Sequence, residues 1–242
     1  PLMLRGELPQ IQISDIQKET LFPEISLRSF RRHTRAFLKI QDGCNSRCSY
    51  CIVPHARGRS RSLPPERVFE HLEALKEKGY KEVVLTGIHI GAYGLDLSPP
   101  CPLERLLRQL EREETPDRIR LSSIEPGDFS PGLISFLSQS TKVCPHLHIP
   151  IQNGDDEILQ KMNRDYDRSF LYDLIRQLHQ RITKLCIGAD VIVGFPGETE
   201  EKFNHTYRLI ESLPLSYLHV FPFSKRRGTP AFQFPQGVNE VE

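Results

Sequence analysis

The sequence lacks the features that would place it in a membrane or among secreted proteins. It contains no apolar run of membrane-spanning length, and it does not open with a signal peptide. Its six cysteines, three of them crowded into one short stretch, do not form the even framework of a secreted disulfide-rich domain. We therefore expect a cytoplasmic protein in a reducing compartment, with no membrane partner.

Neither sign of charge is in excess. The chain has 32 Lys and Arg against 31 Asp and Glu, a formal net charge of +1 at pH 7, so the total indicates no class of partner. The distribution is uneven, because nine basic residues and one acidic residue lie between Arg28 and Arg61. A basic segment of this kind is typical of a surface that attracts phosphate groups.

What the sequence does contain is a regular alternation of strand and helix signals. At 242 residues and 38% hydrophobic, the chain is long enough for one sizeable core. The alternation predicts an α/β fold with a parallel sheet and right-handed crossovers. The expected strands are residues 36–40, 82–87, 118–124, 146–152, 189–195 and 217–223. The expected helices are a segment from Pro65 to Gly79 and segments 103–110, 131–138, 171–182 and 203–210.

Polar residues follow several of the expected strands. In parallel barrels the carboxyl ends of the strands form the reactive rim, so we expect these side chains to lie there together. The residues are Thr86, Ser123, Glu125, Gln152 and Glu198.

The stretch QDGCNSRCSYC places Cys44, Cys48 and Cys51 within eight positions, with no fourth cysteine nearby. Three thiolates suit a site that keeps one coordination position open, and cysteine sulfur is the usual ligand of a 4Fe–4S cluster. A tetrahedral zinc site completed by His55 is an alternative that the ligand types allow. Three packed free cysteines are a further interpretation, which the polarity of the loop disfavours. The isolated cysteines are expected to be small buried hydrophobic residues: Cys101, Cys144 and Cys186.

The cysteine stretch closely resembles the signature of the radical S-adenosylmethionine (radical SAM) superfamily, which implies a partial (β/α)6 TIM-like barrel. In that family the iron without a cysteine ligand binds the amino and carboxylate groups of S-adenosylmethionine. An electron from the cluster then breaks a sulfonium bond and gives a 5′-deoxyadenosyl radical.

The resemblance extends along most of the chain and narrows the family. Segments similar to those of the methylthiotransferases are RAFLKIQDGCNSRCSYCIVPHARGRSRS, VVLTGIHIGAYGLDL, RLSSIEP, HIPIQNGDDEIL, MNRDY and DVIVGFPGETEEKF. The segment LTGIHIGAYG favours the branch that thiomethylates N6-threonylcarbamoyladenosine, next to the anticodon of tRNA, over the isopentenyladenosine and ribosomal-protein branches. The resemblance implies tRNA as substrate and an electron donor such as a flavodoxin-type protein. Two alternatives stay open, a methylthiotransferase for a ribosomal-protein side chain and a zinc-dependent nucleic-acid-binding module without catalysis.

The resemblance also implies roles for individual residues. Thr86 and Gly87 are expected to present backbone carbonyls to the cofactor ammonium. Glu125 and Gln152 are expected to touch the cofactor, with a buried hydrogen-bond network as the alternative. Gly194 is expected to approach adenine or to serve only its turn. The full set of expected cofactor-binding residues is Tyr50, Ile52, Thr86, Gly87, Ser123, Glu125, Gln152 and Gly194.

Two further expectations concern arginines and one histidine. Arg57, Arg59 and Arg61 are expected to contact tRNA phosphates, and the alternative is a solvated basic loop. His148 lies among apolar residues and is expected to be a core histidine with satisfied hydrogen bonds.

The chain departs from the family in three ways. Family members carry an N-terminal domain whose three cysteines bind a second 4Fe–4S cluster, and no cysteine precedes Cys44 here. They also carry a C-terminal RNA-binding TRAM domain, and His55 stands where a tyrosine is usual. Because the chain begins with Pro1, we expect a piece of a longer enzyme. Its expected parts are a leader or linker at 1–35, the catalytic domain at 36–223 and a tail at 224–242.

Overall fold

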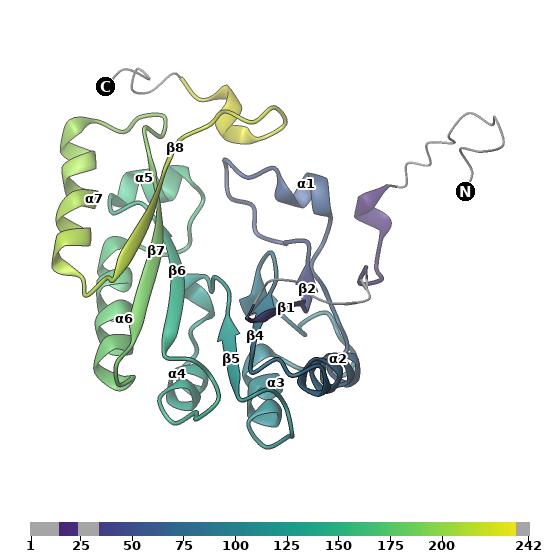
Figure 1. The fold of residues 1–242 in the computed structure, drawn as a ribbon. Helices are drawn as coiled ribbons and strands as arrows, with labels where there is room; N and C mark the ends of the chain where they lie inside the picture. The colour runs from purple at the N-terminus through teal and green to yellow at the C-terminus, as the bar shows by residue number, and fades with distance from the viewer. Residues whose placement is uncertain (1–14, 24–33, 236–242) are drawn as a thin grey trace.

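A computed structural model describes residues 15–23 and 34–235 of the chain. Its framework is a wall of six parallel strands with helices between them (Figure 1). The strands of the wall are β1 (Ala36–Lys39), β4 (Glu82–Thr86), β5 (Arg118–Leu121), β6 (His146–Gln152), β7 (Cys186–Val193) and β8 (Tyr217–Pro222). The helices that connect them are α2 (Pro65–Glu77), α3 (Leu103–Leu110), α4 (Pro131–Leu137), α6 (Arg168–Arg181) and α7 (Glu200–Ser212).

The six strands form two parallel halves, in the orders β1-β4-β5 and β6-β7-β8. The halves meet at β5, where Ile119 N–H donates to Lys142 O at 2.8 Å and Ile124 N–H donates to His148 O at 2.9 Å. Among the described residues, β1 pairs only with β4 and β8 pairs only with β7. The wall is therefore a partial (β/α)6 TIM-like barrel that is open between β1 and β8.

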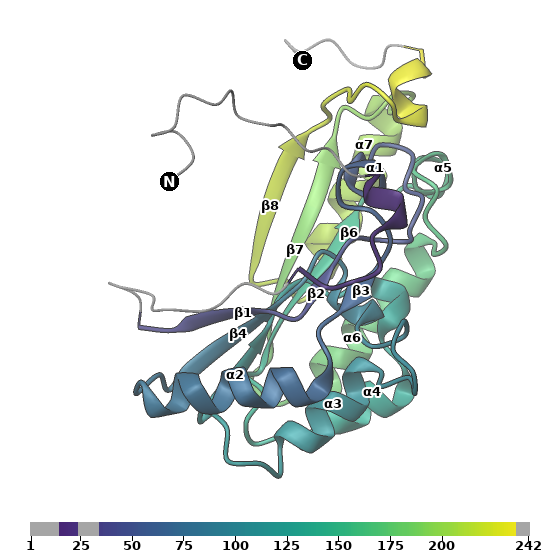
Figure 2. The ribbon, with the colours of Figure 1, turned by 90° about the vertical axis from the view of Figure 1, so that its right-hand side faces the viewer.

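The two faces of the wall differ in chemistry because side chains alternate along a strand. On β1, Ala36 and Leu38 are buried against the helices, and Phe37 between them is more exposed. On the helix side, α3 contributes four leucines from one face to the same core. The helices lie to one side of the strands in Figure 2, so the opposite, concave face is left for polar side chains.

All six predicted strands and five predicted helices are present, with ends that differ from the prediction by up to three residues. The shorter elements did not stand out in the sequence pattern. They are the two-stranded antiparallel ladder of β2 (Gln41–Asp42) and β3 (Arg61–Ser62), the helices α1 (Val53–Arg57) and α5 (Asp156–Lys161), and the 3-10 turns η2 (Ile16–Lys18), η3 (Ile90–Ala92), η4 (Pro126–Asp128) and η5 (Pro230–Gln233).

Parts of the predicted leader and tail contact the domain. From η2, Gln17 Nε2 donates to Pro54 O at 2.7 Å. From η5, the buried Ala231 donates its N–H to Ser49 O at 2.8 Å. Both segments therefore pack around the cysteine loop, while the boundaries at 35 and 224 remain predictions. No helix in the described ranges has the length and apolarity that crossing a bilayer requires.

Candidate cofactor site

The cysteine loop leaves the wall through a tight turn at Gly43. This glycine has φ +71°, and a Cβ built on it would lie 2.0 Å from the carbonyl oxygen of Arg59. Only glycine fits so close an approach with a left-handed backbone. Directly after the turn, Cys44 N–H donates to Gly58 O at 3.1 Å, so the start of the loop is fixed to the chain that returns from α1.

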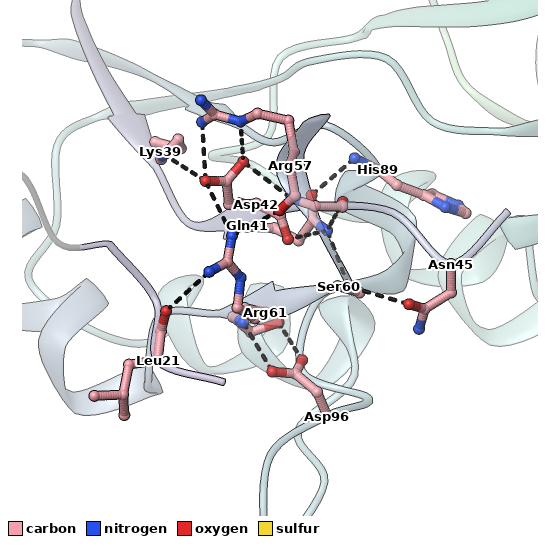
Figure 3. A network of polar contacts seen from close by, with 12 residues as sticks. Leu21, Lys39, Gln41, Asp42, Asn45, Arg57, Ser60, Arg61, His89 and Asp96 are labelled. Carbon is pink, nitrogen blue, oxygen red and sulfur yellow. Dashed lines mark hydrogen bonds and ion pairs between the residues drawn. The ribbon is translucent and has the colours of Figure 1, made fainter. Parts of the chain in front are cut away.

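Asp42 anchors the base of the loop (Figure 3). Its carboxylate lies 3.1 Å from Lys39 Nζ and accepts from Arg57 Nε and Nη2 at 3.0 and 2.9 Å, with Arg61 Nη2 at 3.7 Å. Burial opposes its charge, but hydrogen bonds from Lys39, Gly43 N–H and Arg57 outweigh burial and lower the pKa of Asp42. A buried carboxylate held by three cations makes this end of β2 rigid.

Gln41 links the loop to the end of β4. Its Nε2 donates to Gly43 O at 2.8 Å and to Ser60 Oγ at 2.9 Å, and its Oε1 accepts the N–H of His89 at 2.8 Å. Gly87 makes room for this side chain, because a Cβ there would lie 2.8 Å from Gln41 Oε1. The loop and the β4 rim are thus positioned by one buried amide, visible in Figure 3.

His89 lies against the first thiol of the cysteine loop. Its Nδ1 is 3.7 Å from Cys44 Sγ, and its Nε2 is 2.7 Å from a carboxylate oxygen of Asp128. Burial disfavours the imidazolium, but the contacts with Asp128 and Cys44 outweigh burial and raise the pKa of His89 to about 10. A cation is therefore held beside the Cys44 sulfur.

The three thiols differ in how well the protein alone supports their ionised form. Burial opposes the thiolate of Cys44, but contacts with His89 and Ser46, including Ser46 N–H to Sγ at 3.4 Å, lower the pKa of Cys44. Burial raises the pKa of Cys48 and of Cys51. All three are free and half-buried, so an added cation is what would ionise Cys48 and Cys51.

The spacing of the thiols bears on which metal they fit. In the described part of the chain, one group of His, Cys, Asp or Glu residues is close enough to share a single ion, and it does not include these cysteines. Zinc–sulfur bonds of about 2.3 Å would draw tetrahedral ligands much closer together. The wider arrangement, together with an exposed His55, suits a polynuclear iron–sulfur group better than the predicted zinc alternative.

A buried ion pair supports the other side of the loop. Arg164 Nη1 donates to Glu125 Oε2 at 2.7 Å, and its guanidinium lies 5.9 Å from the ring centre of Tyr50 and 5.6 Å from that of Tyr166. Burial raises the pKa of the Glu125 carboxyl although Arg164 opposes the change. The Glu125 side chain is 28% exposed, so its predicted contact with the cofactor stays a prediction beside this ion pair.

The predicted residues Tyr50 and Gln152 line one cavity of about 200 Å³ beside the cysteine loop, together with Ile192 and Arg226. Gln152 has φ +64°, which turns the chain at the end of β6. Behind this rim Asn153 Nδ2 donates to Glu198 Oε1 at 2.8 Å, and Glu198 Oε2 accepts the N–H of Gly194 at 2.5 Å. A small site with polar and aromatic walls therefore adjoins the cysteine loop.

The other residues predicted to contact the cofactor do not all lie next to this cavity. The carbonyl of Thr86 accepts Ile40 N–H at 2.9 Å and has a second lone pair, so its contact with a cofactor ammonium stays a prediction. Gly87 remains at the rim beside Gln41. Ile52 precedes α1 and contacts the tail at Gly228. Ser123 is exposed and lines a different cavity, which is larger and more open.

The three arginines expected to contact tRNA have different surroundings. Arg59 is exposed, and Arg57 is half-exposed while it holds Asp42. The Arg61 side chain is only 6% exposed, and its Nη2 donates to Arg57 O at 2.8 Å. This corrects the expectation for Arg61, because its guanidinium is part of the buried support of the loop. Of the other basic residues in this segment, Arg28, Arg31 and Arg32 lie outside the described residues.

Sequence reasoning missed several residues of the site. His89 and Arg164 contact the cysteine loop from positions about 40 to 120 residues along the chain, and Asp128 contacts His89; no local pattern relates them to the cysteines. Arg226 lies in the predicted tail and still lines the cavity. Of the isolated cysteines, Cys101 and Cys144 are buried as expected, whereas Cys186 is half-buried.

Comparisons with known proteins agree with this geometry. A family model described as the radical SAM superfamily matches residues 38–210. The chain is 46% identical, over 94% of its length, to the threonylcarbamoyladenosine tRNA methylthiotransferase MtaB of Bacillus subtilis (strain 168) and covers 51% of that protein. It is 43% identical, over 85% of its length, to the tRNA-2-methylthio-N(6)-dimethylallyladenosine synthase of Pelotomaculum thermopropionicum and covers 46% of it. The chain thus spans about half the length of the curated relatives it matches.

Solved structures show the same architecture at low identity. The radical S-adenosylmethionine methyltransferase TsrM from Kitasatospora setae superposes with a TM-score of 0.67 at 20% identity, over 81% of this chain and 38% of TsrM. Methylornithine synthase superposes with a TM-score of 0.59 at 19% identity, over 84% of this chain and 57% of that one. At these identities the likeness concerns the fold.

Proposed function

The chain belongs to the radical SAM superfamily, and on that premise we propose that it is the catalytic domain of a tRNA methylthiotransferase acting on N6-threonylcarbamoyladenosine. The observation that carries the proposal is the 46% identity over 229 residues with a relative named for this reaction, combined with a complete cysteine loop. The overall reaction would replace a hydrogen on the modified adenosine with a methylthio group.

Three cysteines would hold a 4Fe–4S cluster, and the cavity next to them would hold S-adenosylmethionine. The fit rests on the donor set, which is three thiols on one loop without a fourth, spaced too widely for one ion. When bound, this pair of groups supplies an electron and a carbon radical that removes a hydrogen atom from the substrate.

The protein's own residues prepare this site in separate ways. Gly43, Gln41 and Asp42 fix the loop at the end of the wall, so the thiols keep their spacing while a cluster binds. The cationic His89 offsets negative charge at Cys44. Tyr50, set in the loop between Cys48 and Cys51, packs edge-on to Phe195 with ring centres 6.4 Å apart and helps to exclude water from the inner side.

Binding of tRNA would depend on basic side chains at the surface beside the cysteine loop. The exposed Arg59 and the half-exposed Arg57 lie on the segment that returns from α1, next to the cysteine loop, where phosphates would add affinity without reading sequence. We include in the proposal a flavodoxin-type electron donor and a cytoplasmic setting, where tRNA and a reducing environment coincide.

A chimaera tests the proposal most directly. Residues 15–235 would replace the matching segment of the B. subtilis relative, in a strain that lacks that enzyme, and digested tRNA would be analysed by mass spectrometry. We expect a methylthio group on N6-threonylcarbamoyladenosine, and none from the same chimaera carrying Cys48→Ala. A product on dimethylallyladenosine or on a ribosomal protein instead would assign the chain to another branch. A stably expressed, cluster-loaded chimaera without any product would contradict the proposal.

A further inference from the structure

A group of ring and carboxylate side chains lies on the concave face of β6, β7 and β8, deeper than the cysteine loop. We call it the histidine cluster: His146, His148, Asp190, Tyr217 and His219. Asp190 Oδ1 lies 2.8 Å from His148 Nε2 and 3.2 Å from His219 Nδ1. Tyr217 Oη lies 2.8 Å from His146 Nε2 and 3.3 Å from His148 Nδ1. His148 is thus satisfied as predicted, but it lines a cavity.

A glycine makes room for the centre of the cluster. Gly188 of β7 is paired with Tyr217 of β8, and a Cβ at Gly188 would lie 2.1 Å from Cζ of the Tyr217 ring. The ring therefore lies close to the β7 backbone at Gly188, and its hydroxyl reaches both histidines of β6. Any larger residue at 188 would push the tyrosine off the wall, so this surface is shaped by a close approach.

Arginines add positive charge to the same face. Glu82 is the shared partner of three of them, with Arg120 Nε at 2.8 Å, Arg118 Nε at 3.0 Å and Arg35 Nη1 at 3.5 Å. One carboxylate cannot neutralise three guanidinium groups. Burial lowers the pKa of His146, and the positive charge of Arg120 lowers it further, which is the response expected in a positive field.

These groups surround one cavity of about 480 Å³. Arg35 and Arg120 line it from one half of the wall, and the histidine cluster lines it from the other half. The buried hydroxyl of Ser122, also in its lining, has no hydrogen-bond partner among the described residues. The cavity shares Asp190 and Phe221 with the smaller cavity beside the cysteine loop, so the two spaces adjoin.

A metal ion is the first alternative for this cavity, since His148, Asp190 and His219 are close enough to share one. Two observations favour an anion. Asp190 already has both imidazoles as partners, and two arginines line the same space, where their charge repels a cation. Guanidinium groups, imidazoles and a phenol are instead the donor set that recognises a carboxylate.

We propose that this cavity binds the carboxylate of the threonyl group on the substrate adenosine, with Arg120 as its principal donor and the histidine cluster as the polar wall. The inference rests on the function proposed above. It concerns the difference between relatives named for threonylcarbamoyladenosine and relatives named for dimethylallyladenosine. A threonylcarbamoyl group ends in a carboxylate, whereas a dimethylallyl group is apolar. A cavity lined by guanidinium groups beside the cofactor site favours the first, because these groups form charge-assisted hydrogen bonds with a carboxylate and none with an apolar group.

Isothermal titration with nucleosides tests the subsite separately from catalysis. The cluster-loaded chain is titrated with N6-threonylcarbamoyladenosine and with its methyl ester, which keeps the shape and removes the charge. We expect the acid to bind about tenfold more tightly than the ester, the range of a charge-assisted hydrogen bond. Arg120→Gln should reduce this ratio to less than about twofold.

The controls separate the possible failures. Arg118→Gln removes the other close partner of Glu82 without touching the cavity lining, and it should keep the wild-type ratio. Arg35→Gln, at the more exposed end of the cavity, should lower the ratio in part. Binding of S-adenosylmethionine should not change in any variant, because its own carboxylate is expected at the cluster.

Three results would overturn the subsite. They are equal binding of acid and ester by the wild type, an unchanged ratio in Arg120→Gln, and an equal loss in Arg118→Gln. One zinc ion bound tightly per chain and lost in His219→Ala would assign the cavity to a metal instead. Failure of the chimaera to modify tRNA, with the nucleoside ratio intact, would count against the proposed reaction and not against the subsite.

Discussion

At the scale of single residues, the site depends on a few buried charges that lie next to groups of opposite sign. Asp42 is only 2% exposed in its side chain and faces Lys39, Arg57 and Arg61. Removing one partner of a buried ion pair leaves the others uncompensated, which costs more than the pair itself contributes. The cysteine loop begins two residues later, so this energy holds the three cysteines, the proposed cluster ligands, in place.

Asp42→Asn should therefore destabilise the chain by about 3 kcal/mol. Because the folded chain lowers the pKa of Asp42, this stabilisation is complete above the ordinary aspartate pKa, about 4, and is lost as pH falls through the lower folded value. Urea unfolding of both proteins should show a constant gap from pH 5 to 8 that narrows only below about pH 4. Asp15→Asn, at an exposed ion pair, should change stability by less than about 0.5 kcal/mol. A gap that narrows near neutral pH would show that another group dominates.

The cysteines give a second prediction at this scale. Cys48→Ala should lower bound iron from about four atoms per chain to well below one. It should also abolish cleavage of S-adenosylmethionine, because the loop supplies only three ligands. Iron and sulfide analysis after anaerobic reconstitution measures the first effect. Cys101→Ala, at a buried cysteine outside the loop, should keep the cluster. A normal cluster in Cys48→Ala would remove this cysteine from the ligand set.

At the scale of elements, short turns and ladders position the cysteine loop, and the long strands form the framework of the fold. The ladder of β2 and β3 has two residue pairs, yet it sets where the cysteine loop starts and where its support returns. Its geometry depends on Gly43, whose left-handed backbone lies against the carbonyl of Arg59. Helix α5 supports the loop from the far side, since Ser49 Oγ donates to Lys161 O at 2.7 Å.

Two glycines with left-handed backbones provide a matched test of this turn. Gly43→Ala combines an unfavourable φ with a backbone clash, so it should abolish cluster loading and lower the melting temperature strongly. Gly79→Ala has φ +84° but meets no atom within 4 Å, so it should cost about 1–2 kcal/mol and keep the cluster. Absorbance near 400 nm and thermal unfolding would be recorded for both. Equal effects would mean that the close approach at Gly43 is unimportant.

At the scale of the whole molecule, the open side of the barrel determines what the chain can do. The wall ends at β1 and β8 in the described structure, and the concave face between them carries both cavities. The sequence places three of its cysteines on one loop, whereas Cys101, Cys144 and Cys186 are more than 40 residues apart from one another, so we expect ligands for one cluster in this chain. We therefore expect this chain to supply the ligands for radical generation and to lack the further ligands for sulfur supply.

The chain by itself, reduced and given S-adenosylmethionine, should form 5′-deoxyadenosine slowly and leave no methylthio group on tRNA. The physical reason is that its own residues support the cluster loop and cofactor cavity, while a sulfur source needs further ligands. Liquid chromatography with mass spectrometry of the small molecules and of digested tRNA would follow both products. A methylthiolated adenosine made by this chain alone would show that one cluster is sufficient.

Salt dependence tests the basic surface. Binding of tRNA should weaken as salt rises, and Arg59→Gln should reduce the slope of log affinity against log salt by about one unit if Arg59 contacts a phosphate. Arg61→Gln should instead lower stability, since this guanidinium is buried next to Asp42. An unchanged slope in a folded Arg59→Gln protein would leave Arg59 as a solvated residue.

The sequence by itself determined the alternation of strands and helices and the choice of Cys44, Cys48 and Cys51 as the proposed cluster ligands. Strands such as 146–152 can be predicted from the local sequence, because a strand buried on the helix side must be apolar at every second position. Three cysteines within eight positions are close in space in any fold, so the sequence alone predicts that they can act together.

Only the tertiary structure decided which distant residues meet that loop. His89 and Arg164 contact it because the ends of parallel strands converge on one rim, and no spacing along the chain encodes that convergence. The structure also reversed the expectation for Arg61, since its charge is paired with Asp42 across a two-residue ladder. The cavity of the histidine cluster arises in the same way, from alternate residues of separate strands that share one concave face.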